Sequence, residues 1–563
     1  MAERATAQPR TAQVGIVGGG PVGMSLALFL SDYGVSSVLF NAEPGSRTYP
    51  RGNTFNARTM EHFRRVGIAE GVRELGLPDD HPTDVAYFTR YSRHELARIP
   101  MPSSDAKRQA VLAAAADDQV PEPVHRANQM YVEAFLLQEA RRRPEVTLRF
   151  DRTVDELEQD ERGVTLGARP SGDDGGRETW RVGYAVGCDG GQSFVRRTLG
   201  VHYTGESGLD QEIYGGRATA AYLRIPTLYR DYLGDRRAWN YWSMNAEVST
   251  NLIALNGKDE FFMLTSSVRP DSARSEDLVA LVHAAAGAEI PVEVLGLRGW
   301  NPGVALVAES YRAGRVFLAG DAAHLFTPTG GFGMNTGIDD AANLAWKLAA
   351  AAGGWAGDAL LASYEIERRP IGFRNTGAAR SLNARLAQVE RSPELESDGT
   401  VGEEARRRVG AVLSTYGAQF GSIGVQLGAR YDDSPVVVAD GAEPPADDFL
   451  EYRATSVPGG RAPHLWLDEE RGPGSSLFDR LGKGFTLLRL GRDAPDAGPL
   501  REAARAARIP LDVVEVADHG ARDLYERSLV LVRPDQHVAW RGDRPPADAA
   551  GLLRTVAGAG AAA

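Results

Sequence analysis

Residues 314–348 read GRVFLAGDAAHLFTPTGGFGMNTGIDDAANLAWKL, and this stretch decides the fold. Its apolar run 315–319 predicts a short buried strand that ends before Asp321. The glycine-rich run 329–333 then lets the backbone approach a ligand before a helix that begins near Asn335. A helix N-terminus with unpaired N–H groups favours an electron-rich group, so the stretch predicts contact with a large anionic cofactor. The alternative is an ordinary strand, turn and helix with a capping aspartate.

The N-terminus carries a second signal for the same kind of ligand. An apolar run at 13–17 predicts a strand, GGGPVG follows at 18–23, and an apolar helical pattern follows at 24–30. In G-x-G-x-x-G the first glycine makes a tight turn, the second admits a pyrophosphate and the third packs the helix on the strand. A further apolar run at 37–40 completes a βαβ unit. The residues expected at the pyrophosphate are Gly18, Gly20, Pro21 and Gly23.

Such a unit usually ends in an acid that hydrogen-bonds the ribose of the adenosine half. Glu43 lies twenty residues past Gly23, the usual spacing, whereas Asn41 directly ends the predicted strand. Either side chain can bond a 2′-hydroxyl, and Glu43 can equally be a solvated loop charge. The sequence leaves both as candidates.

A third run, YAVGCDGGQSFVR at 184–196, contains an Asp-Gly pair at Asp189. Together with the two glycine-rich segments, it resembles the class A flavoprotein aromatic hydroxylases. Within that group, YPRGN at 49–53, NARTME at 56–61 and the C-terminal segment are most similar to the phenol and 2,4-dichlorophenol hydroxylases. The resemblance extends over nearly the whole chain.

The resemblance implies an FAD-dependent monooxygenase. NADPH or NADH reduces the bound FAD, the reduced flavin captures O2 as a C4a-hydroperoxide, and one oxygen is transferred to an aromatic ring, usually ortho to a phenol hydroxyl. The cofactor carries this chemistry, so the protein supplies positioning, phenol deprotonation and exclusion of water. We therefore expect few acid–base residues and many positioning residues.

The resemblance also assigns FAD contacts residue by residue. Asp321 is expected to bond the ribitol chain, and Asp189 matches a position associated with FAD and NAD(P)H, unless it only ends a strand. Arg51, Arg126 and Gln129 match positions that contact flavin phosphate or ribityl oxygens. Backbone N–H groups beside the isoalloxazine ring are expected to stabilise negative charge near N1 and C2. The residues expected to line that ring are Pro328, Gly331, Gly333, Met334 and Asn335.

Phenol hydroxylases of this group use an acidic residue near the flavin to assist phenol deprotonation, and its position falls on Asn53. An amide cannot take a proton, so Asn53 is expected to orient the substrate hydroxyl while another residue, a water or a tyrosine relay takes the proton. We expect Tyr241 near the substrate for this reason. His324 is expected to be a packed loop histidine. The ten histidines show no metal-ligand spacing with Cys or acids, so no metal site is expected.

Aromatic residues are frequent in the strand-like middle third of the chain, and their alternation suggests that one face points inward. Such residues form the core of a sheet more often than they contact a ligand, but buried tyrosine hydroxyls need partners. The substrate contacts predicted from this region are Tyr214, Tyr222, Trp239 and Met263.

A chain of 563 residues is too long for one core and suggests about three domains. We expect an α/β fold with a Rossmann-type FAD-binding domain at 12–200 and 300–375, an inserted β-sheet substrate layer at 201–299, a helical linker region at 376–450 and a thioredoxin-like C-terminal domain at 451–563. The C-terminal domain contains no cysteine and cannot do dithiol chemistry. Dimer support, lid packing and a purely structural role remain open for it.

Composition limits the partners and the compartment. A net charge of −12 with no basic stripe argues against nucleic acid or an anionic membrane. The single Cys188 excludes an intrachain disulfide, and the N-terminus lacks an apolar signal segment, so we expect a cytoplasmic protein. The expected partners are a small aromatic substrate, O2 and a second copy of the chain in a homodimer or higher homo-oligomer.

Two alternatives of other classes remain. One is a different FAD-dependent oxidoreductase, such as a reductase or a flavin halogenase, although the halogenase segment Trp-x-Trp-x-Ile-Pro is absent. The other is a non-catalytic flavin-binding protein, which the largely intact flavin motifs disfavour. The sequence does not identify the substrate, the preferred nicotinamide or the ring position attacked.

Overall fold

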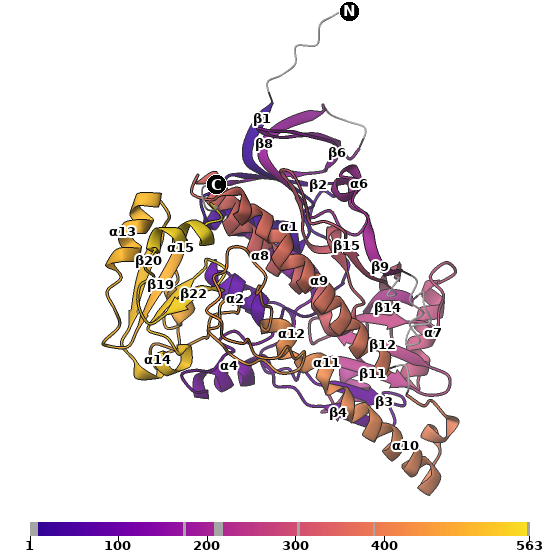
Figure 1. Ribbon diagram of the computed structural model, residues 1–563. Helices are drawn as coiled ribbons and strands as arrows, with labels where there is room; N and C mark the ends of the chain where they lie inside the picture. The colour runs from indigo at the N-terminus through magenta and orange to yellow at the C-terminus, as the bar shows by residue number, and fades with distance from the viewer. Residues whose placement is uncertain (1–8, 173–175, 208–217, 301–303, 387–388, 560–563) are drawn as a thin grey trace, which may run out of the picture.

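A computed structural model describes residues 9–172, 176–207, 218–300, 304–386 and 389–559 (Figure 1). Within these ranges the fold is mixed α/β, as expected, with sheets of eight, seven, three and four strands. Tyr214 is the one predicted site residue that lies outside the described residues. Figure 1 shows the four-stranded C-terminal sheet on one side of the long helices α8 and α9 and the seven-stranded sheet near their far end.

The eight-stranded sheet is built around the N-terminal βαβ unit. Its central order is β16-β17-β8-β1-β2-β5, and β1 pairs in parallel with both β2 and β8. Because β17 also runs parallel to β8 and β5 runs parallel to β2, the carboxyl ends of five strands meet at one edge, where ligands bind in open α/β sheets. The strands are β1 Arg10–Val17, β2 Ser37–Asn41, β5 Val146–Phe150, β6 Arg152–Asp160, β7 Gly163–Pro170, β8 Glu178–Gly187, β16 Arg312–Ala313 and β17 Val316–Leu318.

Helix α1 fills the centre of this layer because it is apolar on nearly every face. Residues 22–31 are all buried, and the helix packs against α5 and α8. The predicted strand 315–319 is observed as β17, and the helix expected near Asn335 begins three residues earlier, at Phe332. The helices of this part are α1 Pro21–Asp32, α2 Ala57–Arg65, α3 Ala69–Arg73, α4 Ser104–Ala113, α5 Gln129–Arg141, α6 Phe194–Thr198, α8 Phe332–Ala352 and α9 Asp358–Leu386.

The seven-stranded sheet has the order β14-β10-β13-β12-β11-β3-β4. Two of its strands, β3 and β4, come from residues 85–99, far upstream of the segment 201–299 in which the substrate layer was expected, and β3 joins through a parallel pairing with β11. Its strands are β3 Val85–Phe88, β4 Glu95–Ile99, β10 Ala218–Arg224, β11 Asn240–Met244, β12 Ser249–Ala254, β13 Glu260–Thr265 and β14 Glu293–Trp300. A three-stranded sheet of β9 Tyr203–Ser207, β15 Val304–Ala308 and β18 His324–Leu325 links the two layers.

Helices from two parts of the chain complete the core on the seven-stranded sheet. Leucine and valine side chains of α7 and α10 belong to the same buried cluster as the sheet residues. These helices are α7 Ser275–Ala286 and α10 Gly399–Leu413, followed by the short α11 Ala418–Gly421 and α12 Ile423–Leu427. Helix α7 covers the face that carries Tyr241, because its Ala285 carbonyl accepts the N–H of Tyr91, which packs on Tyr241, while α10 contacts the edge strand β4. The other face is turned towards α8 and α12.

The C-terminal domain has a sheet of order β20-β19-β21-β22, in which only β19 and β20 run parallel. Its elements are β19 Phe485–Leu490, α13 Gly498–Ala507, β20 Leu511–Val516, α14 His519–Tyr525, β21 Leu529–Val532, β22 Val538–Gly542 and α15 Ala549–Val556. Apolar clusters lie on both faces of the sheet, and one of them includes Trp346 of α8. The thioredoxin-like description of this domain stays a prediction.

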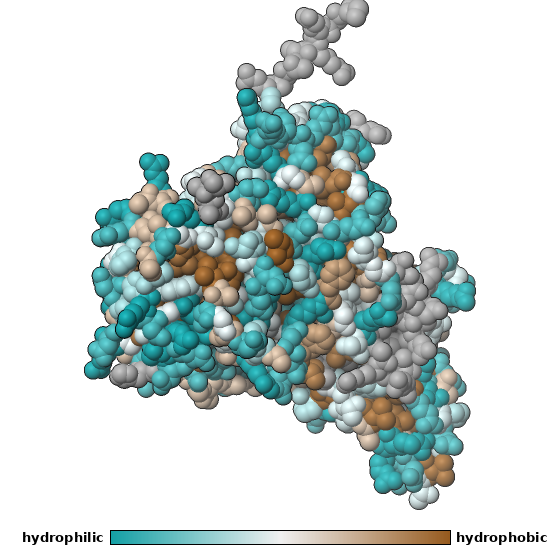
Figure 2. All heavy atoms as spheres, in the orientation of Figure 1, coloured by the Kyte–Doolittle hydropathy of each residue, from teal (hydrophilic) through white to brown (hydrophobic). Residues whose placement is uncertain are grey.

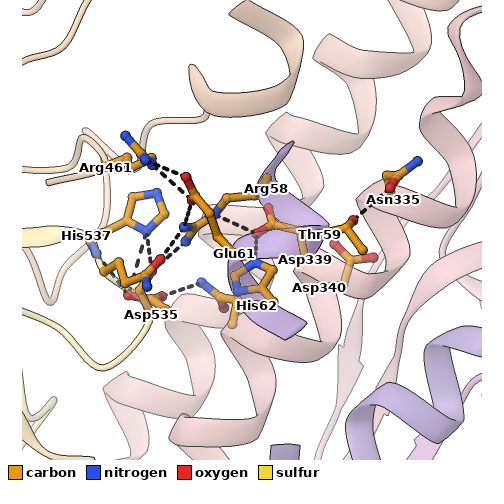
Figure 3. Close-up of polar contacts among 12 residues, drawn as sticks. Arg58, Thr59, Glu61, His62, Asn335, Asp339, Asp340, Arg461, Asp535 and His537 are labelled. Carbon is orange, nitrogen blue, oxygen red and sulfur yellow. Dashed lines mark hydrogen bonds and ion pairs between the residues drawn. The ribbon is translucent and has the colours of Figure 1, made fainter. Parts of the chain in front are cut away.

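A buried ionic network joins the C-terminal domain to α2 and α8 (Figure 3). Arg58 and Arg461 both contact Glu61, and Arg58 also donates to the carbonyl of Asp535 at 2.7 Å. Asp535 in turn accepts from Trp346 at 3.1 Å. Because a buried charge is costly unless it is paired, these contacts hold the domain in one place against the helices.

The face of the molecule shown in Figure 2 is mostly polar. Figure 2 shows hydrophilic side chains over most of the face in view, with hydrophobic ones in small separate groups. No helix within the described ranges combines the length and the apolar character needed to cross a bilayer.

Candidate functional site

Two cavities meet between the eight-stranded and seven-stranded sheets. The first, here named the dinucleotide cleft, has a volume of about 520 Å³ and follows the strand ends at Gly18, Asn41, Asp189 and Asp321. The second, named the aromatic cavity, has a volume of about 420 Å³. The walls common to both are Arg51, Gly52, Asn53, Thr54, Pro328 and Gly331.

The glycine-rich turn at one end of the dinucleotide cleft has no room for side chains at Gly18 and Gly23. Gly18 has φ +114°, and a Cβ there would lie 2.2 Å from the carbonyl oxygen of Cys188. A Cβ at Gly23 would lie 2.0 Å from the carbonyl oxygen of Gly18. No side chain caps the N-terminus of α1, which starts at Pro21, so its first N–H groups remain available to a phosphate. These features fit a pyrophosphate at this turn.

The two ribose candidates both line the dinucleotide cleft. The amide oxygen of Asn41 accepts the N–H of Gly19 at 3.2 Å, and its amide nitrogen donates to the carbonyl of Glu43 at 3.1 Å. The Glu43 carboxylate lies 3.5 Å from Arg47. Asn41 therefore ties the glycine-rich turn to the end of β2, and Glu43 keeps an acceptor on the wall of the cleft.

Two aspartates face the middle of the dinucleotide cleft. Asp321 lies three residues after the end of β17, and burial raises the pKa of its carboxyl against the opposing effect of nearby cations, including Arg51. One carboxylate oxygen of Asp189 accepts the N–H of Val195 at 3.1 Å, while the other is buried without a protein partner. Asp189 therefore stabilises the turn before α6 and still has an acceptor free. Such an acceptor fits a hydroxyl-bearing ligand.

The ring end of the dinucleotide cleft is the turn before α8. Gly330 and Gly331 have φ of +81° and +67°, and Pro328, Gly331, Gly333 and Met334 line the cleft. Asn335 was expected beside them but lies behind the wall, 2% exposed. Its amide nitrogen donates to the carbonyls of Thr54 at 2.9 Å and Gly331 at 2.7 Å. The side chain is therefore used to lock the two walls together, and the contact of the Asn335 backbone N–H with the ring stays a prediction.

Residues 126–129, at the start of α5, contribute side chains to both cavities. Gln129 lines the dinucleotide cleft and donates to Glu133 at 2.6 Å. Arg126, expected at the flavin, lies instead on the aromatic cavity, with its guanidinium 4.0 Å from the centre of the Trp239 ring. The pairing of Phe55 with the neighbouring His125 sets this direction, because successive side chains of an extended segment point to opposite sides.

Asn53 lies where the two cavities meet. Its amide nitrogen donates to the carbonyl of Arg51 at 2.9 Å, and its amide oxygen accepts from Asn128 at 2.5 Å. The side chain is therefore held in place by the protein and presents an amide, not a base, to the junction.

The aromatic cavity is lined by one face of the seven-stranded sheet. Asn240 and Trp242 of β11, together with Asn251 of β12 and Phe262 of β13, are on this face. Trp239, which precedes β11, also lines the cavity, and its contact with the substrate stays a prediction. The opposite wall comes from the start of α8 and from α11 and α12, through Phe332, Phe420 and Gln426.

The predictions of Tyr241 and Met263 as substrate contacts are wrong, because these residues alternate to the other face of the sheet. Tyr241 is fully buried, accepts the N–H of Ala238 at 2.6 Å and packs against Phe88 and Tyr91. Met263 is 1% exposed on the same sealed side. A shift of one residue moves every side chain of a strand to the opposite face.

Tyr222 has the correct face but the wrong position. It shares a face of β10 with the cavity residue Ala220, yet it is not part of the cavity wall. Its hydroxyl donates to Glu260 at 2.7 Å, and Tyr131 donates to the same carboxylate at 2.9 Å. The hydroxyl thus has the partner that a buried tyrosine needs, and it lies beyond the end of the cavity.

His324, expected to be a packed histidine, is fully buried and lies 2.6 Å from Asp340 of α8. Asp340 also accepts the N–H of Gly320 at 3.2 Å. The pair therefore ties the turn at residues 320–324, which carries Asp321, to α8.

Comparison with known proteins decides the family. The family model described as FAD binding domain matches residues 11–379, and the one described as aromatic-ring hydroxylase, C-terminal, matches residues 455–560. The chain belongs to the FAD-dependent aromatic-ring hydroxylases. This confirms the resemblance derived from the three sequence motifs.

Several relatives of this hydroxylase cover nearly its whole length. The FAD-dependent monooxygenase apdD of Emericella nidulans is 34% identical, with 94% of this chain and 87% of the relative aligned. The phenol 2-monooxygenase of Pseudomonas sp. (strain EST1001) is 29% identical, with 95% and 90% aligned. Among solved structures, chromopyrrolic acid-soaked RebC with bound 7-carboxy-K252c is 37% identical, with a TM-score of 0.87, and covers 98% of this chain and 100% of its own.

Several residues of the cavity wall were not predicted from the sequence, and most of them lie on one face of the seven-stranded sheet. Asn240 and Asn251 are polar residues inside apolar strands, and they hydrogen-bond to each other within the buried wall. In β11, Asn240 and Trp242 lie two residues apart and therefore share a face. This pairing of a polar residue with a tryptophan was the sequence signal for the cavity face. The other missed wall residues are Tyr49, Trp242, Phe262, Leu264, Arg298, Phe420 and Gln426.

Proposed function

We propose that this hydroxylase is an NAD(P)H-dependent monooxygenase that adds one oxygen of O2 to a phenolic or related aromatic ring, ortho to an existing hydroxyl. The observation that carries the proposal is the shared wall of the two cavities at Asn53, Pro328 and Gly331. An aromatic ring held in the aromatic cavity reaches the same wall that the flavin ring of FAD would contact. When bound, FAD would supply the redox chemistry, taking electrons from NAD(P)H and activating O2.

The residues that would hold FAD are those of the dinucleotide cleft. The turn at Gly18 and the N-terminus of α1 suit the pyrophosphate, and Asn41 or Glu43 suits the adenosine ribose. Asp321 and Gln129 suit the hydroxyls of the ribitol chain. The open N–H groups at the start of α8 would stabilise negative charge on a reduced flavin ring.

The aromatic cavity offers few groups that could accept the proton of the phenol. No Asp, Glu or His of the described residues lines the aromatic cavity, and the Tyr49 hydroxyl already donates to the carbonyl of Ala220 at 2.7 Å. Burial also raises the pKa of Tyr49, which makes it a weak proton carrier. We infer that the phenol ionises to solvent, aided by arginine charge near the junction, and that Asn53 orients its oxygen.

The apolar wall has a separate task in this proposal. Trp242, Phe262 and Leu264 line one side of the cavity with ring and methyl groups, so that water has few partners on that side. Excluding water protects the activated oxygen from being lost as peroxide. The C-terminal domain then acts as a structural support, because it has no cysteine for redox chemistry, pairs Arg461 with Glu61 of α2 in a buried ion pair and accepts a hydrogen bond from Trp346 of α8 at Asp535.

The test is oxygen-dependent NAD(P)H oxidation by the FAD-loaded protein with a panel of phenols and polycyclic aromatic metabolites. The proposal predicts that some aromatic compound stimulates the oxidation and gives a product heavier by one oxygen atom. Peroxide is measured in parallel to separate hydroxylation from uncoupled oxidation. Stimulation with only peroxide formed and no oxygenated product from any compound would contradict the proposal in favour of a reductase or oxidase.

A further inference from the structure

The charges on the aromatic cavity are all of one sign. Its charged wall residues are Arg51, Arg126 and Arg298, and no Asp or Glu of the described residues lines it. Arg298 lies at an exposed part of the wall, with its guanidinium 4.7 Å from the centre of the Tyr49 ring. A cavity with cationic groups and low-dielectric aromatic walls concentrates anions.

Arg126 is the most unusual of the three, because it is 5% exposed and has no carboxylate partner among the described residues. One terminal nitrogen donates to the hydroxyl of Thr54, and the other contacts only the sulfur of Met101 at 3.8 Å. Its Nε is buried and has no hydrogen-bond partner. The edge formed by Nε and Nη2 thus lacks an oxygen acceptor, and this edge can bind the two oxygens of a carboxylate side by side.

The surroundings of Arg126 do not compensate its charge. Burial lowers the pKa of its guanidinium to about 9, and no neighbouring acid opposes this shift. The pKa of nearby Lys107 is lowered to about 7 by burial and by the positive charges of Arg126 and Arg73. Stacking on Trp239 contributes a cation–π interaction, but a ring quadrupole offsets only part of the cost of burying a charge.

We propose that the substrate of this hydroxylase is an aromatic carboxylate, and that Arg126 binds its carboxylate through the Nε–Nη2 edge while Trp239 stacks beside it. This inference rests on the proposed function and adds the substrate class. A carboxylate suits the edge better than a phenolate does, because it offers two oxygens. Arg126 is then the residue that determines specificity for the acid, whereas Asn53 and Arg51 lie at the junction near the reacting ring.

The experiment measures equilibrium binding to the full-length, FAD-loaded protein through the change in flavin fluorescence. The probes are pairs of a hydroxyaryl carboxylic acid and its methyl ester, from hydroxybenzoates to hydroxynaphthoates and hydroxyanthracene carboxylates. A charge-assisted bidentate contact predicts that the wild-type protein binds the preferred acid at least about tenfold more tightly than its ester. Esters that bind as tightly as their acids throughout the panel would overturn the inference.

Three variants locate the effect. Arg126→Met should lose the preference for the acid, and Arg126→Lys should keep part of it, since the charge remains without the fork. Arg141→Met is the matched control, because Arg141 is exposed at the end of α5, and it should retain the full preference. If Arg126→Met folds, binds FAD and still prefers the acid, the assignment to Arg126 is wrong. If it fails to fold, the wild-type comparison and Arg126→Lys still decide.

Measuring both binding and turnover distinguishes failure of the carboxylate site from failure of the proposed function. A clear preference for the acid without oxygenated product would contradict the proposed function and support the carboxylate site. Equal oxygenation of acids and esters, with equal affinities, would support the proposed function and overturn the carboxylate site.

Discussion

Replacing Arg461 by methionine should weaken the junction between the C-terminal domain and α2. The free energy of unfolding should fall by more than the loss of the packing contacts of Arg461 alone would cause. Arg461 and Glu61 are each 1% exposed at their side chains, and Arg461 Nε lies 3.1 Å from a Glu61 oxygen. Removing one partner of a buried ion pair costs about 3–5 kcal/mol. Because Arg58 still lies 2.9 Å from Glu61, we expect the lower end, about 3 kcal/mol.

The pH dependence of stability is a second test of the same contact. Burial opposes ionisation of Glu61, but Arg461 and Arg58 outweigh it and hold the pKa of this carboxyl below its usual value. A depressed pKa means that the stabilisation is present above the unfolded-state value, about 4.3, and is lost as the pH falls through the folded-state value. The difference between wild type and Arg461→Met should therefore be full near neutral pH and shrink in acid.

The assay is urea unfolding of the FAD-loaded protein, followed by circular dichroism and by release of flavin fluorescence. A double variant, Glu61→Leu with Arg461→Met, removes both charges and should recover part of the loss, because replacing a whole buried pair by apolar groups is often neutral. A cost below about 0.5 kcal/mol for Arg461→Met, the size of ordinary surface substitutions, would refute the assignment of this pair as a stabilising contact. A double variant as unstable as the sum of the two single variants would show that the charges act independently.

Three further predictions concern the site. Asp321→Ala should weaken FAD retention by about tenfold or less, the value of a hydrogen bond to a neutral hydroxyl, as measured by equilibrium dialysis; unchanged affinity would place Asp321 away from the cofactor. Asn53→Asp should raise hydroxylation near neutral pH by up to about 10²–10⁴-fold, because a carboxylate accepts the phenol proton, whereas the wild-type rate should rise with pH through the pKa of the bound phenol; identical pH profiles would show that residue 53 does not face the hydroxyl. Trp242→Ala should raise KM for the aromatic substrate, while Tyr241→Phe should leave KM unchanged and lower only thermal stability; the opposite pattern would mean that the sheet faces are assigned the wrong way round.

The glycine-rich segments could be predicted from the sequence because their chemistry is local. A G-x-G-x-x-G turn between a strand and a helix admits no side chain at Gly18 or Gly23, and the structure has a Cβ-excluding contact at both. Asp321 could be placed for the same reason, since one strand end and one turn determine where it points. These residues needed no knowledge of distant parts of the chain.

The substrate face could not be predicted with the same certainty because both faces of the seven-stranded sheet are apolar and aromatic. Tyr241 and Trp242 are equally plausible by composition, and the packing of α7 against the Tyr241 side decides which face is sealed. The recruitment of β3 by β11 is likewise a long-range pairing. Local pattern carries no information about either choice.

Arg126 was misplaced because its direction depends on a contact with a distant segment. The bridge between Phe55 and His125 fixes the strand-like segment before α5, and Arg126 then points towards Trp239 and away from the dinucleotide cleft. The buried pair of Glu61 and Arg461 depends in the same way on a separation of 400 residues. Tertiary packing, not local propensity, sets both.

The most direct test of the central claim is a single turnover with ¹⁸O2. The FAD-loaded protein is reduced with NAD(P)H in the absence of oxygen, mixed with an aromatic substrate from the panel and then exposed to ¹⁸O2. The account predicts a product with one ¹⁸O atom in a new ring hydroxyl ortho to the existing one, formed in proportion to the reduced flavin. A product oxygen that comes from water, or reoxidation that yields only labelled peroxide with every compound, would contradict the claim that the two cavities bring the ring to the flavin.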